Sequence, residues 1–137
     1  MLLCDTSGLI AFFDSSEQSH ADVARTVEAD PGPYLVSPYV LAELDYLIGT
    51  RRGVEAELLV LDELAGGAWE LVAFDASDVQ EARGVVDQYR DQALGLADAS
   101  LVVLARRYGT HRILTLDHRH FRLMRAHDGL PFDIVPA

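Results

Sequence analysis

The sequence predicts an α/β domain with a mainly parallel central sheet flanked by helices. Short apolar runs with the character of strands alternate with longer segments of helical periodicity along the 137 residues. This alternation is typical of a parallel sheet whose strands are joined through helices. No internal repeat, low-complexity tract or linker interrupts it. We therefore expect one domain over residues 1–137, which is long enough to bury one sizeable core.

The first half of the chain is expected to hold two strands and four helices. Residues 30–33 contain two prolines and a glycine, which predicts a turn before the second strand. Ser37 followed by Pro38 predicts a helix start, because serine caps helices and proline is favoured at the first helical position. The expected elements are a strand at 1–4, helices at 6–14 and 17–29, a strand at 34–36, and helices at 38–50 and 54–64.

The second half continues the alternation with three strands and three helices. Asp75, with Asp78 three residues later, is the expected cap of one helix, and Gly109 is expected to end the next. The apolar run at 113–116 is the expected central strand. The expected elements are a strand at 69–74, helices from 75 to about 93 and at 96–108, a strand at 113–116, a helix at 118–125 and a strand at 132–135.

The composition indicates a cytoplasmic protein that does not enter a membrane. Half of the residues are hydrophobic, as in soluble globular proteins, and the longest apolar run is far short of a membrane span. The N-terminus lacks the positive segment of a secretory signal, and its apolar run ends at Asp5. Cys4 is the only cysteine, so no internal disulfide is possible.

The net charge of −11 argues against a nucleic-acid partner, because contacts to phosphate supply most non-specific affinity. Metal bound in an acidic pocket would cancel part of this charge locally. The chain has no lysine, and six of its arginines fall in the C-terminal third. That basic group is either a solvated face that balances acids elsewhere or a patch for phosphates. A basic protein partner is a further explanation of the acidic charge.

Four acids stand at positions where an acid is unexpected. Asp5 and Asp117 each follow an apolar strand directly. Glu43 is one turn from Val40 and is expected to share its apolar side, and Asp98 lies at the start of its helix. A buried carboxylate is costly unless something positive compensates it, and without lysine a metal ion is the natural candidate.

The predicted topology brings these acids together. Ligand sites in open parallel sheets form beyond the carboxyl ends of the strands, and a helix that follows a strand begins at the same edge. One acidic cleft of oxygen ligands suits Mg²⁺ or Mn²⁺. One or two such ions would activate a water and stabilise the leaving oxygen in phosphodiester hydrolysis. Taken singly, Asp5 and Asp117 also fit helix caps, and Asp98 fits an acid favoured by the helix dipole.

These segments resemble the motifs of PIN domains. Residues 3–10 are similar to the opening of that family, and residues 40–44 to its central glutamate helix. Residues 96–99 resemble the segment with the third acid, and residues 114–117, with Phe121 four residues on, resemble the terminal block. The motifs span nearly the whole chain in the family's order, so the resemblance predicts a PIN-like fold.

Within PIN domains the chain is similar to the VapC toxins of bacterial VapBC toxin–antitoxin systems, and residues 37–47 match an actinobacterial type of VapC unusually fully. The resemblance implies a Mg²⁺-dependent endoribonuclease, usually a homodimer, inhibited by a VapB-type antitoxin, with which it forms a hetero-oligomer. It implies RNA substrates such as tRNA or the sarcin–ricin loop of 23S rRNA, and the motifs do not choose between them. The implied acidic metal site is Asp5, Glu43, Asp98 and Asp117, supported by the hydroxyls of Thr6 and Thr115.

Two contact surfaces are expected around this site. Arg112, Arg119 and Arg122 are expected to guide the RNA backbone, because the guanidinium fork binds phosphate with two hydrogen bonds. The helix at 6–14 is too apolar for one buried stripe, so it is expected to form an antitoxin groove with the helix at 38–50, unless its aromatic residues fill the core. The expected antitoxin contacts are Leu9, Ile10, Phe12, Phe13, Leu44 and Leu47.

Other readings remain. A response-regulator receiver and a haloacid-dehalogenase-type phosphatase each need a lysine that this chain lacks. A non-catalytic PIN-fold module that acts through protein contact stays open, and so does a PIN nuclease that acts on DNA or flap structures. The antitoxin is expected to place a basic side chain among the four acids, in competition with metal.

Overall fold

Five short strands form one sheet in which every pairing is parallel, in the order β3-β2-β1-β4-β5. The computed structural model describes residues 1–137 and confirms the predicted α/β class. Strand β1 is central, since Leu3 pairs with Leu35 on one side and with Ile113 on the other. The strands are β1 (Leu2–Cys4), β2 (Tyr34–Val36), β3 (Trp69–Leu71), β4 (Arg112–Leu114) and β5 (Asp133–Val135).

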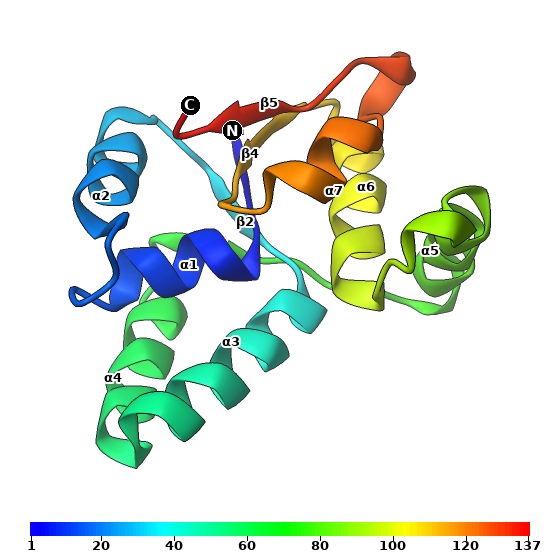
Figure 1. The fold of residues 1–137 in the computed structure, drawn as a ribbon. Coiled ribbons are helices and arrows are strands. Elements are labelled where there is room, and N and C mark those ends of the chain that lie inside the picture. Colours follow the sequence, from blue (N-terminus) through cyan, green and yellow to red (C-terminus); the bar gives the residue numbers. More distant parts are fainter.

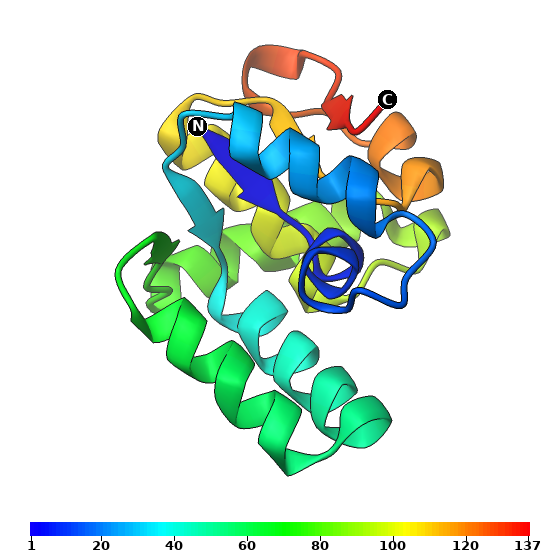
Figure 2. The same ribbon diagram turned by 90° about the vertical axis from the view of Figure 1, so that its left-hand side faces the viewer.

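Seven α-helices surround the sheet (Figure 1). They are α1 (Thr6–Phe13), α2 (His20–Ala29), α3 (Pro38–Arg52), α4 (Val54–Ala65), α5 (Ala76–Gln88), α6 (Leu96–Tyr108) and α7 (His118–Leu123), with 3-10 turns η1 (Arg90–Gln92) and η2 (His127–Gly129). Helices α3 and α4 form a hairpin that extends away from the sheet (Figure 2). None of the helices combines the length and the apolar character needed to cross a membrane.

The core lies around the central strands and α6. All of β1 is buried, and α6 is buried without interruption from Ala99 to Ala105. Parallel strands covered on both faces are expected to read as continuous apolar runs, as β1 does. Because α6 is enclosed, its first turn holds Asp98 firmly beside the edge where β1 and β4 end.

Helix α1 lies unusually close to the end of β4. A Cβ atom added at Gly8 would be 2.7 Å from the carbonyl oxygen and from the Cγ atom of Leu114. Only glycine allows this approach. The close approach brings Asp5, the residue after β1, against Thr115, the residue after β4.

The structure differs from the expected elements mainly at their ends. Helix α2 begins three residues late, because Asp14 accepts the main-chain N–H of Ser16 and holds the preceding segment in a turn. Helix α5 ends at Gln88, followed by η1 and by Ala93 in the left-handed region at φ 51°. Strand β3 is shorter than expected and ends at Leu71.

Candidate active site

The four acids line one cavity of about 470 Å³ at the carboxyl ends of β1 and β4. Asp5 directly follows β1, as predicted, whereas β4 ends at Leu114 and not at the expected residue 116, so Asp117 lies three residues beyond it. Asp98 comes from the first turn of α6, and Glu43 comes from α3. The structure therefore brings together all four residues that the sequence groups.

Asp5 is buried and its carboxylate is fixed by two hydroxyls. Its Oδ2 accepts hydrogen bonds from Ser7 Oγ at 3.0 Å and from Thr115 Oγ1 at 2.7 Å. The same hydroxyls accept main-chain N–H groups: Ser7 accepts that of Leu116, and Thr115 accepts that of Asp117, both at 2.9 Å. This network fastens the segment after β1 to the segment after β4 at the floor of the cleft.

Of the two hydroxyls that were predicted to support the site, only that of Thr115 contacts one of the four acids. Thr115 bonds to Asp5 as expected, whereas Thr6 Oγ1 is buried and has no hydrogen-bond partner. Ser7 fills the place that the sequence reasoning gave to Thr6. Its signal in the sequence was a hydroxyl two residues after an acid at a strand end. A buried hydroxyl without a partner costs about 1–3 kcal/mol of stability, so a polar ligand that forms a hydrogen bond with Thr6 Oγ1 would recover this energy.

Glu43 is exposed, and the expectation that it shares the apolar side of its helix is wrong. The buried stripe of α3 consists of Val40, Leu44 and Ile48. Because α3 extends away from the sheet, only that stripe is covered. Glu43 lies beside it on the wall of the acidic cleft.

Like charges act on each other across the cleft. Burial and the neighbouring carboxylates of Asp5, Asp117 and Glu43 together raise the pKa of Asp98 to about 6, against the opposing effect of His120. Burial also raises the pKa of Asp5, although the hydrogen bonds from Thr115 and Ser7 oppose the rise. The cleft therefore concentrates negative charge that its own residues do not neutralise.

His120 lies inside this acid cluster. Its Nδ1 is 3.1 Å from Asp117 Oδ2 and 3.7 Å from Asp98 Oδ2. Asp117 caps α7, since its Oδ1 accepts the main-chain N–H of His120 at 3.4 Å. This place among the acids was not expected from the sequence. Its position three residues after a capping aspartate was the signal that places its ring here.

The donor chemistry of the cleft fits a hard divalent cation. Carboxylate oxygens are the ligands that Mg²⁺ and Mn²⁺ prefer, the negative charge is unbalanced, and the Thr6 hydroxyl lacks a partner. No three of the acidic, histidine or cysteine side chains are gathered closely enough to hold an ion as they stand. Binding therefore requires the carboxylates to turn further into the cleft.

The arginines separate into two groups. Eight of the eleven form ion pairs with acids. The three without an acidic partner are Arg119, Arg122 and Arg125, on α7 and just after it, and all are exposed. Arg51, which the sequence reasoning missed, lies at the end of α3 and lines the acidic cleft. Arg51 therefore brings a positive charge to the wall of the cleft, and Arg119 and Arg122 lie on the same helix as His120, which also lines it.

Arg112 is not near the cleft, and its expected place beside the RNA path is wrong. It begins β4, at the opposite end of the strand from Asp117. Its Nη1 is 2.6 Å from Oδ2 of the buried Asp30, and its Nε is 3.4 Å from Asp133. Arg112 therefore compensates a buried charge at the far edge of the sheet.

The expected antitoxin contacts fall into three environments. Leu9 and Leu44 are fully buried, which makes them core residues. Ile10, which is nearly buried, and Leu47 line the acidic cleft. Only Phe12 and Phe13 line a separate groove, and both also pack against the core.

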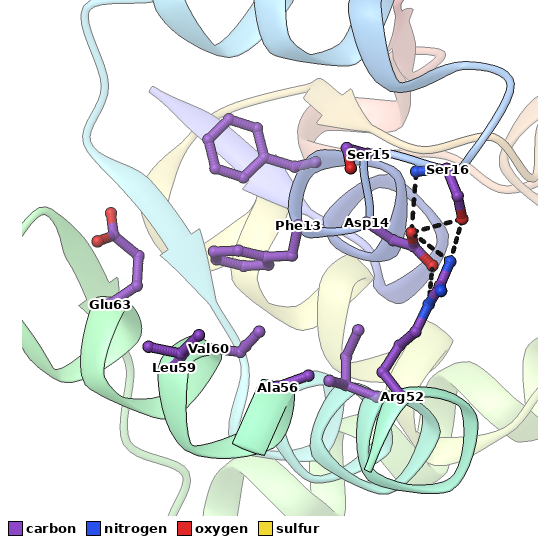
Figure 3. Close-up of a pocket in the computed structure, with 11 residues that line it drawn as sticks. Phe13, Asp14, Ser15, Ser16, Arg52, Ala56, Leu59, Val60 and Glu63 are labelled. Carbon is purple, nitrogen blue, oxygen red and sulfur yellow. Dashed lines mark hydrogen bonds and ion pairs between the residues drawn. The ribbon is translucent and has the colours of Figure 1, made fainter. Parts of the chain in front are cut away.

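That groove has a volume of about 610 Å³ and lies between the end of α1 and the α3–α4 hairpin (Figure 3). Its opposite wall is mainly α4, with Ala56, Leu59 and Val60, while the predicted wall of α3 contributes Ile48 and Arg52. Arg52 closes one end through paired hydrogen bonds to Asp14 at 3.1 and 2.8 Å.

Comparisons with known proteins agree on one family. The family model described as PIN domain matches residues 2–126. The chain is 51% identical over 135 residues to Ribonuclease VapC26 of Mycobacterium tuberculosis, a match that covers 98% of this chain and 100% of that protein.

Two solved structures share the fold. The structure of VapC20 from Mycobacterium tuberculosis, a sarcin–ricin loop cleaving toxin, has a TM-score of 0.81 at 18% identity, covering 87% of this chain and 92% of that chain. VapBC2 from Rickettsia felis, bound to a DNA fragment from its promoter, has a TM-score of 0.71 at 16% identity, covering 97% of each chain.

Proposed function

This chain belongs to the PIN domain family, and on that premise we propose that it is a VapC-type toxin of a type II toxin–antitoxin system. Its activity is that of a metal-dependent endoribonuclease that hydrolyses phosphodiester bonds in structured RNA. The observation that carries this proposal is the convergence of four carboxylates from four separate elements on one cleft whose negative charge is unbalanced. The relative named Ribonuclease VapC26 supports it.

The metal is Mg²⁺, with Mn²⁺ as a substitute. Asp5, Asp98 and Asp117 would hold it, and Glu43 would serve as a ligand or orient the attacking water. When bound, such an ion activates water and stabilises the leaving oxygen of the phosphodiester. The chain's own part is to hold Asp5 rigid through Ser7 and to keep the cleft walls in place.

The RNA backbone runs over the unpaired arginines of α7 into the cleft and towards Arg51. Arg119 and Arg122 suit this role because no acid of the chain occupies their guanidinium groups, which leaves them for phosphate. The substrate is a tRNA or the sarcin–ricin loop of 23S rRNA. These substrates differ in the position of the cut, so they are distinguished by mapping RNA ends.

Cleavage by the purified chain tests the proposal directly. The protein is incubated with total RNA and, side by side, with single-stranded DNA, with Mg²⁺ or with EDTA, and new 5′ ends are sequenced. We expect RNA cleavage that EDTA abolishes. Asp5→Asn should lose it, whereas Asp62→Asn, on the exposed face of α4, should retain it. Cleavage of DNA alone, or no cleavage by the active-site-intact chain, would contradict the proposal.

The partner is a VapB-type antitoxin, and the toxin works in the cytoplasm as a homodimer or in a hetero-oligomer with that antitoxin. We place an apolar antitoxin helix in the groove between Phe12, Phe13 and Leu59, with a basic side chain reaching the carboxylates. Another solved structure with this fold is a toxin–antitoxin complex from Klebsiella pneumoniae. Inhibition should weaken as Mg²⁺ rises, because the basic side chain and the ion compete for the same charge.

Leu59 allows a direct test of this groove. It is 70% exposed although it is a leucine. Leu59→Asp should weaken antitoxin binding by roughly tenfold or more, measured by titration calorimetry. The control is Leu123→Asp on α7. Leu123 is a leucine that is 50% exposed, but it lies outside the groove. Equal effects of the two substitutions would place the antitoxin elsewhere.

A further inference from the structure

We propose that His120 is a positioning residue for the metal-binding carboxylates. It holds both oxygens of Asp117 and reaches Asp98, and so keeps these two carboxylates side by side at the cleft, from where they can turn onto a divalent cation. This inference rests on the proposed function, because it concerns the metal that the nuclease requires. The role belongs to the imidazole N–H at Nδ1, acting through a hydrogen bond.

The contacts of His120 are concentrated on one carboxylate. The main-chain N–H of His120 donates to Asp117 Oδ1 at 3.4 Å, and the ring nitrogen Nδ1 lies 3.1 Å from Asp117 Oδ2. One residue therefore grips both oxygens and sets the plane of the carboxylate. The same Nδ1 is 3.7 Å from Asp98 Oδ2, so the ring lies between the two acids.

This grip leaves room for a cation. An ionised carboxylate has about four lone-pair sites, and the two donors of His120 come from α7 on one side of Asp117. The remaining lone pairs are free for a ligand in the cleft that Asp117 and His120 both line. Without the ring, Asp117 would keep one main-chain bond and could rotate away from Asp98, whose negative charge repels it.

No other histidine does this. His118, two residues away on the same helix, contacts Arg122 at 3.3 Å, and His20 contacts the carbonyl oxygen of Ala11. His111 and His127 lie ring to ring at 6.2 Å, away from the four acids. His118 is therefore a matched control, because it offers the same side chain on the same helix without a contact to a cleft carboxylate.

Metal binding is measured by isothermal titration of Mn²⁺ and of Mg²⁺ into the purified metal-free chain. Groups that orient metal ligands typically contribute 10- to 100-fold in metal affinity. We expect His120→Ala to weaken Mn²⁺ binding by roughly tenfold and His118→Ala to leave it unchanged. His120→Asn should restore most of the affinity, because its amide nitrogen takes the place of Nδ1. Melting curves of the metal-free variants show whether each one is folded, and the asparagine variant serves if the alanine variant is not.

The outcomes separate this inference from the proposed function. If the unmodified chain binds neither ion, the metal-dependent function fails and His120 has no site to position. If the unmodified chain binds metal while His120→Ala binds it equally or more tightly, His120 is a bystander or a competitor and only the positioning role is overturned. A loss of affinity that asparagine does not rescue would also overturn it, since the Nδ1 donor would not be the cause.

Discussion

Replacing Asp98 by asparagine should stabilise the metal-free protein at neutral pH, with most of the gain lost near pH 4. Burial and the neighbouring acids raise the pKa of Asp98 from 3.8 to about 6. Between these two values the folded state binds more protons than the unfolded state, so the free energy of unfolding falls as the pH rises. Above pH 6 the folded protein carries the full cost of the ionised side chain. Asparagine has nearly the same shape and never ionises.

The structure sets the size of this effect. A rise in pKa from 3.8 to about 6 corresponds to about 3 kcal/mol at neutral pH. Water reaches the side chain, which is 22% exposed, and lowers this value, so we expect a gain of roughly 1–3 kcal/mol. For a chain of 137 residues such a gain raises Tm by roughly 3–10 °C.

Urea denaturation in EDTA at pH 4.0 and pH 7.5 measures the difference between Asp98→Asn and the unmodified chain. Asp62→Asn, on the exposed face of α4, controls for the loss of one negative charge. Adding Mg²⁺ should stabilise the unmodified chain more than the Asp98→Asn variant. The reasoning is refuted if the gain is absent at pH 7.5, if it is the same at both pH values, or if Asp62→Asn reproduces it.

Two further predictions concern the approach of α1 to β4 and the path of the RNA. Gly8→Ala should destabilise the fold by about 1–3 kcal/mol, because its Cβ would lie 2.7 Å from a carbonyl oxygen of β4. Gly84→Ala, in a helix position with open space around it, should instead stabilise by about 0.5–1 kcal/mol in the same urea assay, and a shared sign would refute this reasoning. Replacing both Arg119 and Arg122 by alanine should weaken RNA binding and lower the slope of log affinity against log salt by roughly 1.4, whereas Arg83→Ala, in a helix-surface ion pair, should change neither.

Most of the fold could be predicted because its signals are local. Strand β2 and helix α6 have the predicted bounds, since a proline- and glycine-rich turn, the Ser37 cap and Gly109 mark their ends. The grouping of Asp5 with Asp117 could also be predicted, because parallel strands place their carboxyl ends at one edge. Errors at element ends arose where side chains hold the backbone in turns, as Asp14 does before α2.

The remaining site features depend on contacts that periodicity does not contain. Spacing shows which residues share a face of a helix, but it does not show which face another element covers. Leu9 of α1 and Leu44 of α3 are therefore core residues, while Glu43, next to Leu44 on α3, is exposed. Similarly, Ser7 supports Asp5 in a hydrogen-bond network with Thr115, which is 108 residues away. No local sequence pattern identifies a pair that is so far apart.

The hydrogen bond between Thr115 and Asp5 joins residues that are 110 positions apart. At a synthesis rate of about 5–20 residues per second, roughly 5–20 s separate the appearance of Asp5 from that of Thr115 during translation. Until then β1 also lacks β4, one of its two neighbours in the sheet. The cleft cannot be complete before Asp117 has been synthesised, so no activity can arise until the growing chain has passed that residue.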